Sequence, residues 1–260
     1  MHWYDRKGNS AHTVRSANGT ERATTLRDAR KLGLMPSVTT VLGILDKPAL
    51  TTWKCKEAIK AAMLLNQGDW ESDEDFISRC LVESSKPAKE AADIGSQIHD
   101  AIESAFHGRE FPPEFRQHVN AVDRELAKLF PEVSDWISEE SFAHHLGFAG
   151  RVDLYSPSTG IVVDYKTKDG DFSDGKKLAY DQNYQLGAYR LGLQLPQGNR
   201  SANIFVSRTH PGAVASHLWT PEQVDQGEAI FIGLLDVWKI VKGYDGAFIE
   251  TNHSQLESVA

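Results

Sequence analysis

The sequence predicts an α/β protein with a central mixed β-sheet flanked by helices and a helical extension at its N-terminal end. Alternating and β-branched runs between residues 148 and 165, separated by turn formers, are typical of two neighbouring strands. Helical spacing of apolar residues over residues 178–193 predicts a helix beside them. Strand-like runs at residues 202–207 and 213–219 then extend the sheet.

The composition is normal for a soluble globular protein. Of 260 residues, 40% are apolar and 25% are charged. The formal net charge of -8 argues against a protein that coats nucleic acid through bulk charge, but it leaves room for a local basic cleft. No apolar run is long enough to cross a membrane, and the first ten residues lack the pattern of a signal peptide. The two cysteines, Cys55 and Cys80, form no CxxC pair, so we expect a cytoplasmic protein with no membrane partner.

Short helical patterns fill the N-terminal part. Residues 25–34 predict a short helix, preceded by an irregular hairpin. Ser37 is a suitable N-cap for the apolar helix that follows, and Pro48 marks the first turn of the next one. Trp53 and Lys54 lie on that next helix, where the lysine belongs either to a solvated face or to an edge that contacts phosphate groups.

A longer helix with a histidine at its edge is expected next. Two serines and Pro87 predict a helix start, so that residues 88–107 form one helix and residues 76–82 a separate short one. His99 lies at the edge of the apolar stripe, and Gly95 lies one turn before it on the same face. We expect the glycine to leave open space for a substrate or a metal, although a lone histidine in such a place is more often structural.

The chain is organised around the hairpin of residues 148–165. Because side chains alternate along a strand, Asp164 and Lys166 point to one face while Tyr165 packs on the other. Asp153 on the partner strand would lie close across the hairpin. Two carboxylates and a lysine suit a divalent cation beside a water that must lose a proton. The same residues also fit a solvated sheet face with a surface ion pair.

Flanking elements offer further polar side chains. Residues 137–144 predict a strand on which Glu139 and Glu140 occupy opposite faces, so that only one can face the site. After the hairpin, helical spacing aligns three polar residues along one side of a helix. If this side faces the sheet, the three residues could orient a phosphate or a water; otherwise they belong to the solvated face of the helix. These residues are Gln182, Gln185 and Tyr189. Residues 114–130 and 221–241 predict two more helices, the second capped by Thr220.

Taken in order, the motifs resemble those of the RecB-type branch of the PD-(D/E)XK nucleases, which have a restriction-endonuclease-like core. The matching segments are GSQIH with Gly95 and His99, GRVD with Gly150 and Asp153, DYK with Asp164 and Lys166, and QLGAY with Gln185 and Tyr189. Val152 replaces the proline of the family name, a change that this branch tolerates. The N-terminal part more loosely resembles phage-encoded exonucleases and the mitochondrial genome-maintenance exonuclease.

The resemblance implies a metal site. His99, Asp153, Asp164 and the backbone carbonyl of Tyr165 would hold Mg²⁺, and Mn²⁺ would substitute for it. Glu140 would contact one of these ligands without touching the ion itself, or it would bind a second ion. Family members with an iron–sulfur cluster carry four cysteines, so no such cluster is expected here.

It also implies catalytic and DNA-binding roles. Lys166 would orient the attacking water and stabilise the charge that builds on the phosphate. Gln185 and Tyr189 would fix the scissile phosphate or the lysine, with Gln182 supporting them. The remaining candidates for contact with DNA are Ser37, Trp53, Lys54, Gly95 and Arg151.

The expected function is a Mg²⁺-dependent DNA exonuclease of a phage or prophage recombination, replication or repair system. Residues 1–82 would form the extension and a candidate clamp for a DNA end, residues 83–245 the nuclease core, and residues 246–260 a tail. The expected partners are single-stranded or duplex DNA ends, and a phage recombinase or single-strand-binding protein. An endonuclease of the same fold, or a non-catalytic DNA-binding protein on a nuclease scaffold, remain alternatives.

The requirement for a DNA end rests on three features. No base-reading module is recognisable, and the acidic chain disfavours coating of a duplex. If the N-terminal helices close over the site, a strand would have to enter from its end, with Trp53 available for base stacking.

Overall fold

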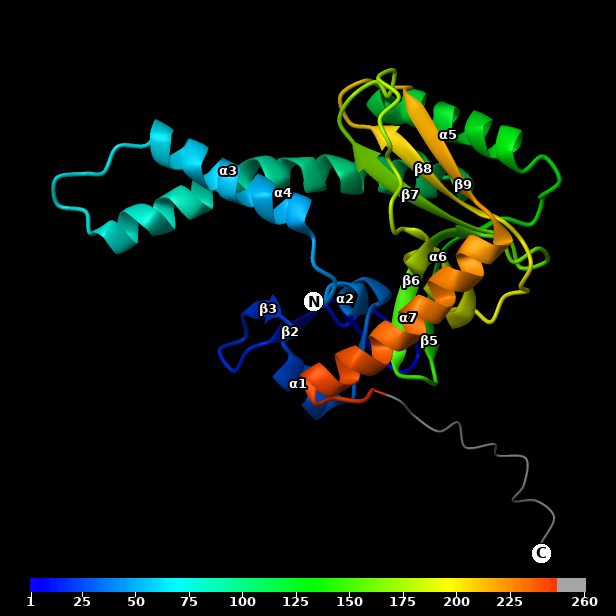
Figure 1. Ribbon diagram of the computed structural model, residues 1–260, viewed down its shortest axis with the longest axis horizontal. Helices are drawn as coiled ribbons and strands as arrows, with labels where there is room; N and C mark the ends of the chain where they lie inside the picture. Colours follow the sequence, from blue (N-terminus) through cyan, green and yellow to red (C-terminus); the bar gives the residue numbers. More distant parts are fainter. Residues whose placement is uncertain (247–260) are drawn as a thin grey trace, which may run out of the picture.

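A five-stranded mixed sheet forms the centre of the computed structural model, which describes residues 1–246 (Figure 1). Its strands, in spatial order, are β5 (Ile137–His144), β6 (Phe148–Tyr155), β7 (Val162–Lys168), β8 (Ser201–Ser207) and β9 (Val214–Trp219). Neighbouring strands run antiparallel except β7 and β8, which run parallel. The predicted α/β class with a mixed sheet is therefore confirmed.

Helices cover both faces of this sheet. The covering helices are α4 (Asp73–Phe106) and α5 (Arg116–Leu129) on one face, and α6 (Asn183–Gly192) and α7 (Pro221–Lys242) on the other. A short 3-10 helix, η1 (Pro113–Phe115), leads into α5. Adjacent strand residues divide between the two cores, as the two-residue period requires: Val162 packs with the α6–α7 side, and Val163 packs with the α4–α5 side.

The N-terminal part adds short elements beside this sheet. They are β1 (Trp3–Tyr4), β2 (Thr13–Arg15), β3 (Glu21–Ala23), α1 (Leu26–Leu32), β4 (Met35–Pro36) and α2 (Val38–Leu42). The predicted helix boundaries agree with the capping bonds. Thr25 caps α1, Gly33 ends it at φ 65°, and Ser37 caps α2. Thr220 likewise caps α7 with Pro221 in its first turn, as predicted.

The predicted break before Pro87 is wrong, because α4 is one helix of 34 residues. Ser72 caps it through a bond from the Asp75 N–H, and three acidic residues favour its first turn. Pro87 lies inside the helix, where proline removes one backbone hydrogen bond. Residues 85–90 around the proline are exposed, and the good helix formers that follow it, Ala88 to Ala92, continue the helix. Another helix packs along the N-terminal half of α4. The predicted boundary between residues 82 and 83 therefore falls within a continuous helix.

That other helix is α3 (Pro48–Leu64), which begins with Pro48 as predicted. Figure 1 shows α3 lying along the N-terminal half of α4, so that the two form a helical hairpin that projects sideways from the sheet. We call this hairpin the arm. Trp53 is 37% exposed on it, and Lys54 is exposed beside it.

Helix α6 begins later than its periodicity predicts, at Asn183 and not at residue 178. Gln182 folds back so that its side-chain oxygen accepts a bond from the Tyr180 N–H at 2.7 Å, which makes a turn in place of the first helical turn. Glycines then bring α6 and α7 close together: a Cβ on Gly187 would lie 2.3 Å from the backbone nitrogen of Glu228. This close crossing fixes how α6 sits over the sheet.

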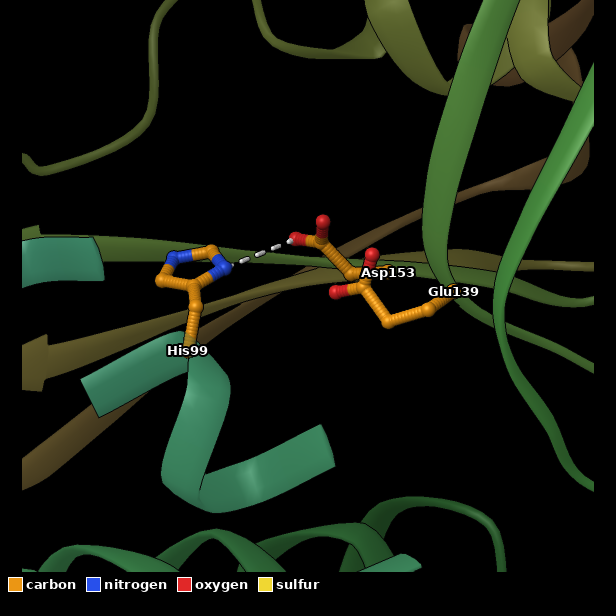
Figure 2. Close-up of side chains that lie close together, drawn as sticks. All are labelled: His99, Glu139 and Asp153. Atoms are coloured by element: carbon orange, nitrogen blue, oxygen red, sulfur yellow. Dashed lines mark ion pairs between the residues drawn. The ribbon is translucent and has the colours of Figure 1, made fainter. Parts of the chain in front are cut away.

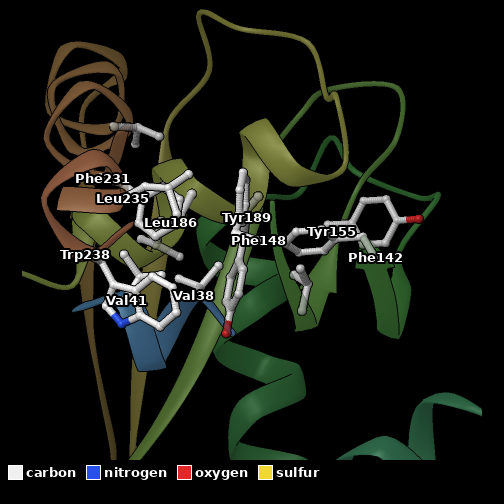
Figure 3. Close-up of a cluster of buried hydrophobic side chains, with 14 of the residues drawn as sticks. Val38, Val41, Phe142, Phe148, Tyr155, Leu186, Tyr189, Phe231, Leu235 and Trp238 are labelled. Carbon is white, nitrogen blue, oxygen red and sulfur yellow. The ribbon is translucent and has the colours of Figure 1, made fainter. Parts of the chain in front are cut away.

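The core on the α6–α7 side reaches as far as the predicted site (Figure 3). Tyr189 of α6 packs among these apolar side chains and meets the Phe142 ring edge to face at 6.2 Å. In the described part of the chain, no helix combines the length and apolar character needed to span a bilayer. Residues 247–260, most of the predicted tail, lie outside the described residues.

Candidate metal and catalytic site

Three side chains that suit a metal ion converge beside the sheet. His99 of α4, Glu139 of β5 and Asp153 of β6 each place one ligand atom within 4.8 Å of the others (Figure 2). His99 Nδ1 lies 3.8 Å from Asp153 Oδ2. Two of the three, His99 and Asp153, are residues that the sequence predicted for a metal site.

The pairing of the strands explains the position of Asp153. β6 pairs with β7 only at Leu154–Val163 and Tyr155–Val162, so the two strands separate beyond these residues. Asp153 lies where they part, and its Oδ2 accepts the backbone N–H of Tyr165 at 2.7 Å. The predicted closeness of Asp153 to the DYK strand is thus observed.

Glu139, and not the predicted Glu140, faces this site. Ser138 pairs with Leu154 and Glu140 with Val152, and the ladder is interrupted between these pairs. Glu139 lies at this interruption, across from Asp153, with a left-handed backbone at φ 58°. Glu140 is exposed. The register of the two strands is set by the three-residue turn that ends at Gly147, where φ is 87°. The prediction did not use this turn.

Glu139 carries the strongest electrostatic perturbation in the cleft. Burial first, and then the Asp153 carboxylate, raise its pKa from 4.5 to about 8, although Arg151 opposes the shift. Arg151 Nε lies 2.5 Å from Glu139 Oε2, and a second nitrogen of Arg151 lies 3.4 Å from Glu103. The predicted DNA contact Arg151 therefore reaches the cleft while it is held between two acidic residues.

A second group of predicted residues surrounds Asp164. Lys166 Nζ lies 2.8 Å from Asp164 Oδ1 and 2.7 Å from Oδ2. Gln185 Nε2 donates to Asp164 Oδ1 at 2.9 Å and to the Tyr189 hydroxyl at 2.7 Å, and its own oxygen accepts from Lys166 at 3.1 Å. The two-residue and helical periodicities predicted this convergence correctly.

The two members of this ion pair, Asp164 and Lys166, differ in how far they are exposed to solvent. The Asp164 side chain is 2% exposed, whereas the Lys166 side chain is 32% exposed and can be reached from solvent. Burial alone would lower the pKa of Lys166, but the Asp164 and Asp153 carboxylates outweigh it and raise this pKa. Lys166 is therefore held as a positive charge beside Asp164.

The trio opens into a cleft of about 420 Å³. Its lining residues are Ala91, Ala92, Gly95, Ser96, His99, Asp100, Glu103, Glu139, Arg151, Asp153, Thr167 and Arg208. Asp164 and Lys166 are not among these lining residues. Among the described residues, nothing from the first 82 positions lines the cleft, so the arm does not close over it.

Gly95 does not leave the open space that we expected from the sequence. A Cβ at this position would lie only 2.7 Å from Thr167 Oγ1, because α4 packs tightly against β7 here. The glycine instead allows the close approach that sets His99 against the sheet.

We expect Gly95→Ala to push α4 away from β7 and to lower metal-dependent cleavage by up to about 100-fold, as a misplacement near 1 Å does. Adding Thr167→Ala should restore activity, because the Thr167 Cβ is 3.7 Å away, an ordinary contact. Alanine favours a helix by about 1 kcal/mol over glycine, so a weakened helix cannot explain the loss. Initial cleavage rates of both variants test this, and wild-type activity of Gly95→Ala would contradict it.

Three other predicted residues take different positions. Ser37 is buried, and its hydroxyl accepts the Thr40 N–H at 3.0 Å, so it caps a helix and does not reach DNA. The Gln182 side chain closes the turn before α6 and does not support the site. Tyr165 gives its N–H to Asp153 and buries its ring beside His99 at 5.9 Å, while the role of its carbonyl stays a prediction.

Three residues near the site were missed. Asn203 of β8 donates to Asp164 Oδ2 at 2.7 Å, and Trp219 of β9 donates to Asn203 at 2.8 Å. Arg208 follows β8, lines the cleft and binds Asp169 at 2.9 Å. Parallel strands end at one sheet edge, which places Arg208 near the end of β7, but the sequence alone gave no reason to single it out.

The donor set of the trio fits a divalent cation. One imidazole and two carboxylates suit Mg²⁺ or Mn²⁺. Octahedral ligands at about 2.1 Å from one ion stand about 3.0 Å apart when cis and about 4.2 Å apart when trans, so at least two of the three pairs must close to about 3 Å when the ion binds. Asp164 is not one of the three, and both of its oxygens accept bonds from other side chains. It can join them only after Lys166 leaves one of these oxygens.

Comparisons with known proteins do not assign a family. No protein-family model and no curated protein matches the chain. The crystal structure of SSO0001 matches with 12% identity and a TM-score of 0.31, over 72% of this chain and 86% of that one. The crystal structure of a phage-related exonuclease from Haemophilus somnus 129PT matches with 14% identity and a TM-score of 0.27, over 72% and 95%. Similarities this low carry no argument about activity, which must come from the site itself.

Proposed function

We propose that this chain is a divalent-metal-dependent nuclease that hydrolyses phosphodiester bonds of DNA. That it begins at a free end is proposed from the resemblance of its motifs to those of phage-encoded exonucleases, since the arm does not close over the cleft. One observation carries the proposal: His99, Glu139 and Asp153 converge within 4.8 Å in an open cleft, next to a lysine fixed by Asp164. A nitrogen and carboxylate donor set beside a fixed cation is the combination that phosphodiester hydrolysis needs. The order of the motifs in the chain supports the same reaction.

The chemistry divides among the residues as follows. A bound Mg²⁺ or Mn²⁺ supplies a Lewis acid for a phosphate oxygen and lowers the pKa of its water. The side chains of His99, Asp153 and Glu139 would hold that ion. Lys166 would stabilise the negative charge that develops on the phosphate, since its charge is fixed by Asp164.

Gln185 and Tyr189 would act through Lys166. The Gln185 side-chain oxygen accepts from Lys166 Nζ at 3.1 Å, and the Tyr189 hydroxyl accepts from Gln185 at 2.7 Å. Both residues are buried on α6, so they cannot move freely. They would hold the lysine in place and leave its exposed tip to the substrate.

Three positive side chains and one aromatic side chain are the candidate contacts along a path for DNA. Arg151 and Arg208 line the cleft, and Lys54 and Trp53 are exposed on the arm, whose helix α4 carries His99. Phosphate contacts along such a path position a strand without reading its sequence. A phage or prophage recombination, replication or repair system, with a recombinase or a single-strand-binding protein as partner, would supply suitable DNA ends in the cytoplasm.

The test compares linear with covalently closed circular DNA, in single- and double-stranded form, at equal nucleotide concentration. With Mg²⁺ or Mn²⁺ we expect linear DNA to be degraded and closed circles to be spared, and we expect EDTA to stop the reaction. Labels at the 5′ and 3′ ends report the polarity. Cutting of circles as fast as linear DNA would make the protein an endonuclease, and binding without cutting would make it a non-catalytic DNA-binding protein.

A further inference from the structure

A line of hydrogen bonds crosses three neighbouring strands and ends on the catalytic carboxylate. Asn203 lies directly opposite Asp164 in the parallel β7–β8 pair and is fully buried. Its Nδ2 donates to Asp164 Oδ2 at 2.7 Å, and its Oδ1 accepts the indole N–H of Trp219 at 2.8 Å. Neither Asn203 nor Trp219 belongs to a motif that suggested the site.

The partners determine which way the Asn203 amide points. An amide has one accepting and one donating end, and the indole N–H of Trp219 can only donate. The Asn203 oxygen must therefore face Trp219, and its NH₂ group must face Asp164. Gln185 is oriented by the same logic, because Lys166 can only donate and thus binds the Gln185 oxygen.

Asp164 is consequently held from both sides by amide groups. Gln185 donates to Oδ1 at 2.9 Å, and Asn203 donates to Oδ2 at 2.7 Å. A carboxylate has about four lone-pair positions, and Lys166 occupies the remaining one on each oxygen. The two amides are buried, whereas Lys166 is partly exposed. Lys166 is thus the partner that can yield a position while the amides keep the carboxylate plane in place.

We propose that Asn203, oriented by Trp219, is a positioning residue that fixes the plane of Asp164 for the metal-dependent reaction. This inference rests on the proposed nuclease function. Trp219 sets the orientation of the amide, and the amide sets the plane of the carboxylate. That carboxylate holds Lys166, and it can offer an oxygen to an ion held by His99, Glu139 and Asp153 once Lys166 yields that position. Buried partners of this kind typically change metal affinity or activity by about 10- to 100-fold when they are removed.

The informative variant is Trp219→Phe, which keeps an aromatic ring and removes the N–H donor. Without that donor the Asn203 amide can rotate and turn its oxygen toward Asp164, where two acceptors face each other. We expect Mn²⁺ affinity, measured by calorimetry, to fall by about 10- to 100-fold. Trp238→Phe is the matched control, because Trp238 is also buried but lies on α7, and the indole that donates to Asn203 is that of Trp219. It should keep wild-type affinity.

A second measurement needs neither metal nor activity. In ¹⁵N-labelled protein, Asn203→Leu should shift the indole N–H signal of Trp219 and accelerate its exchange with solvent. Trp219→Phe should shift the side-chain NH₂ signals of Asn203. If Asn203→Leu does not fold, Trp219→Phe and its control still carry the test.

The outcomes separate the two proposals. Weaker Mn²⁺ binding in Trp219→Phe but not in Trp238→Phe, with the coupled signals, supports the positioning role. Two results would overturn the positioning role: wild-type Mn²⁺ affinity in Trp219→Phe, or side-chain NH₂ signals of Asn203 that do not shift in that variant. A wild-type protein that neither binds Mn²⁺ nor cuts DNA overturns the nuclease proposal itself, whatever the hydrogen-bond signals show.

Discussion

Replacing Lys166 with alanine is expected to lower the rate of DNA cleavage by about 10²- to 10³-fold, the usual loss for one electrostatic stabiliser of a transition state. The ammonium group is fixed on Asp164 at 2.7 Å and remains 32% exposed, so it is placed to act on the phosphate. DNA affinity should change only a few-fold, because one phosphate contact among several is lost. Single-turnover cleavage and a binding isotherm in Ca²⁺ measure the two effects separately.

Lys168→Ala is the matched control for this variant. Lys168 lies two residues along the same strand, but its Nζ donates to the Leu178 carbonyl at 3.0 Å, away from Asp164. It should cleave at nearly the wild-type rate. A Lys166→Ala protein that bound DNA poorly yet cut the bound fraction normally would contradict the proposed role.

Replacing Asp153 with asparagine should abolish metal binding and cleavage together. Asp153 lies between His99, at 3.8 Å, and the Tyr165 N–H, at 2.7 Å, so the substitution removes a charge from the centre of the trio. We expect Mn²⁺ affinity to fall by more than about 10²-fold, beyond the loss caused by an outer partner. Calorimetry with Mn²⁺ and cleavage of linear DNA, each against an EDTA blank, provide the measurement.

Asp100→Asn controls for the loss of a negative charge from the same cleft. Asp100 lines the cleft and is exposed, but it is not a member of the trio. Its substitution should leave Mn²⁺ affinity close to that of the wild type. Equal losses in both variants would mean that the cleft attracts cations only through its general charge, and the proposed site would then be wrong.

Local signals in the sequence predicted much of the fold. Ser37, Pro48 and Thr220 were recognised as helix starts because capping depends on a few adjacent residues. Pro87 misled the prediction, because the residues after it, Ala88 to Ala92, are good helix formers that continue the helix past the proline. A proline marks a possible helix start, but it does not show whether the chain before it is already helical.

The same distinction applies to the site. Asp164, Lys166 and Gln185 converge as their spacing predicts, since periodicity determines the face of a strand or helix. Glu139 depends on the register of a whole hairpin, and Asn203 depends on pairing across a crossover of 39 residues. Contacts at such separations must be seen in three dimensions.

The continuity of α4 makes it a lever. Its tight contact with β7, at Gly95, is the natural pivot, with Asp73 about 33 Å away on one side and His99 about 6 Å away on the other. A tilt that carries the tip of the arm by about 5 Å therefore moves His99 by only about 1 Å, unless bending at Pro87 absorbs it. A shift of that size in a ligand is enough to change a reaction rate by two orders of magnitude. A molecule that binds the far end of the arm and tilts it would therefore move the His99 imidazole by a small fraction of the movement of the tip.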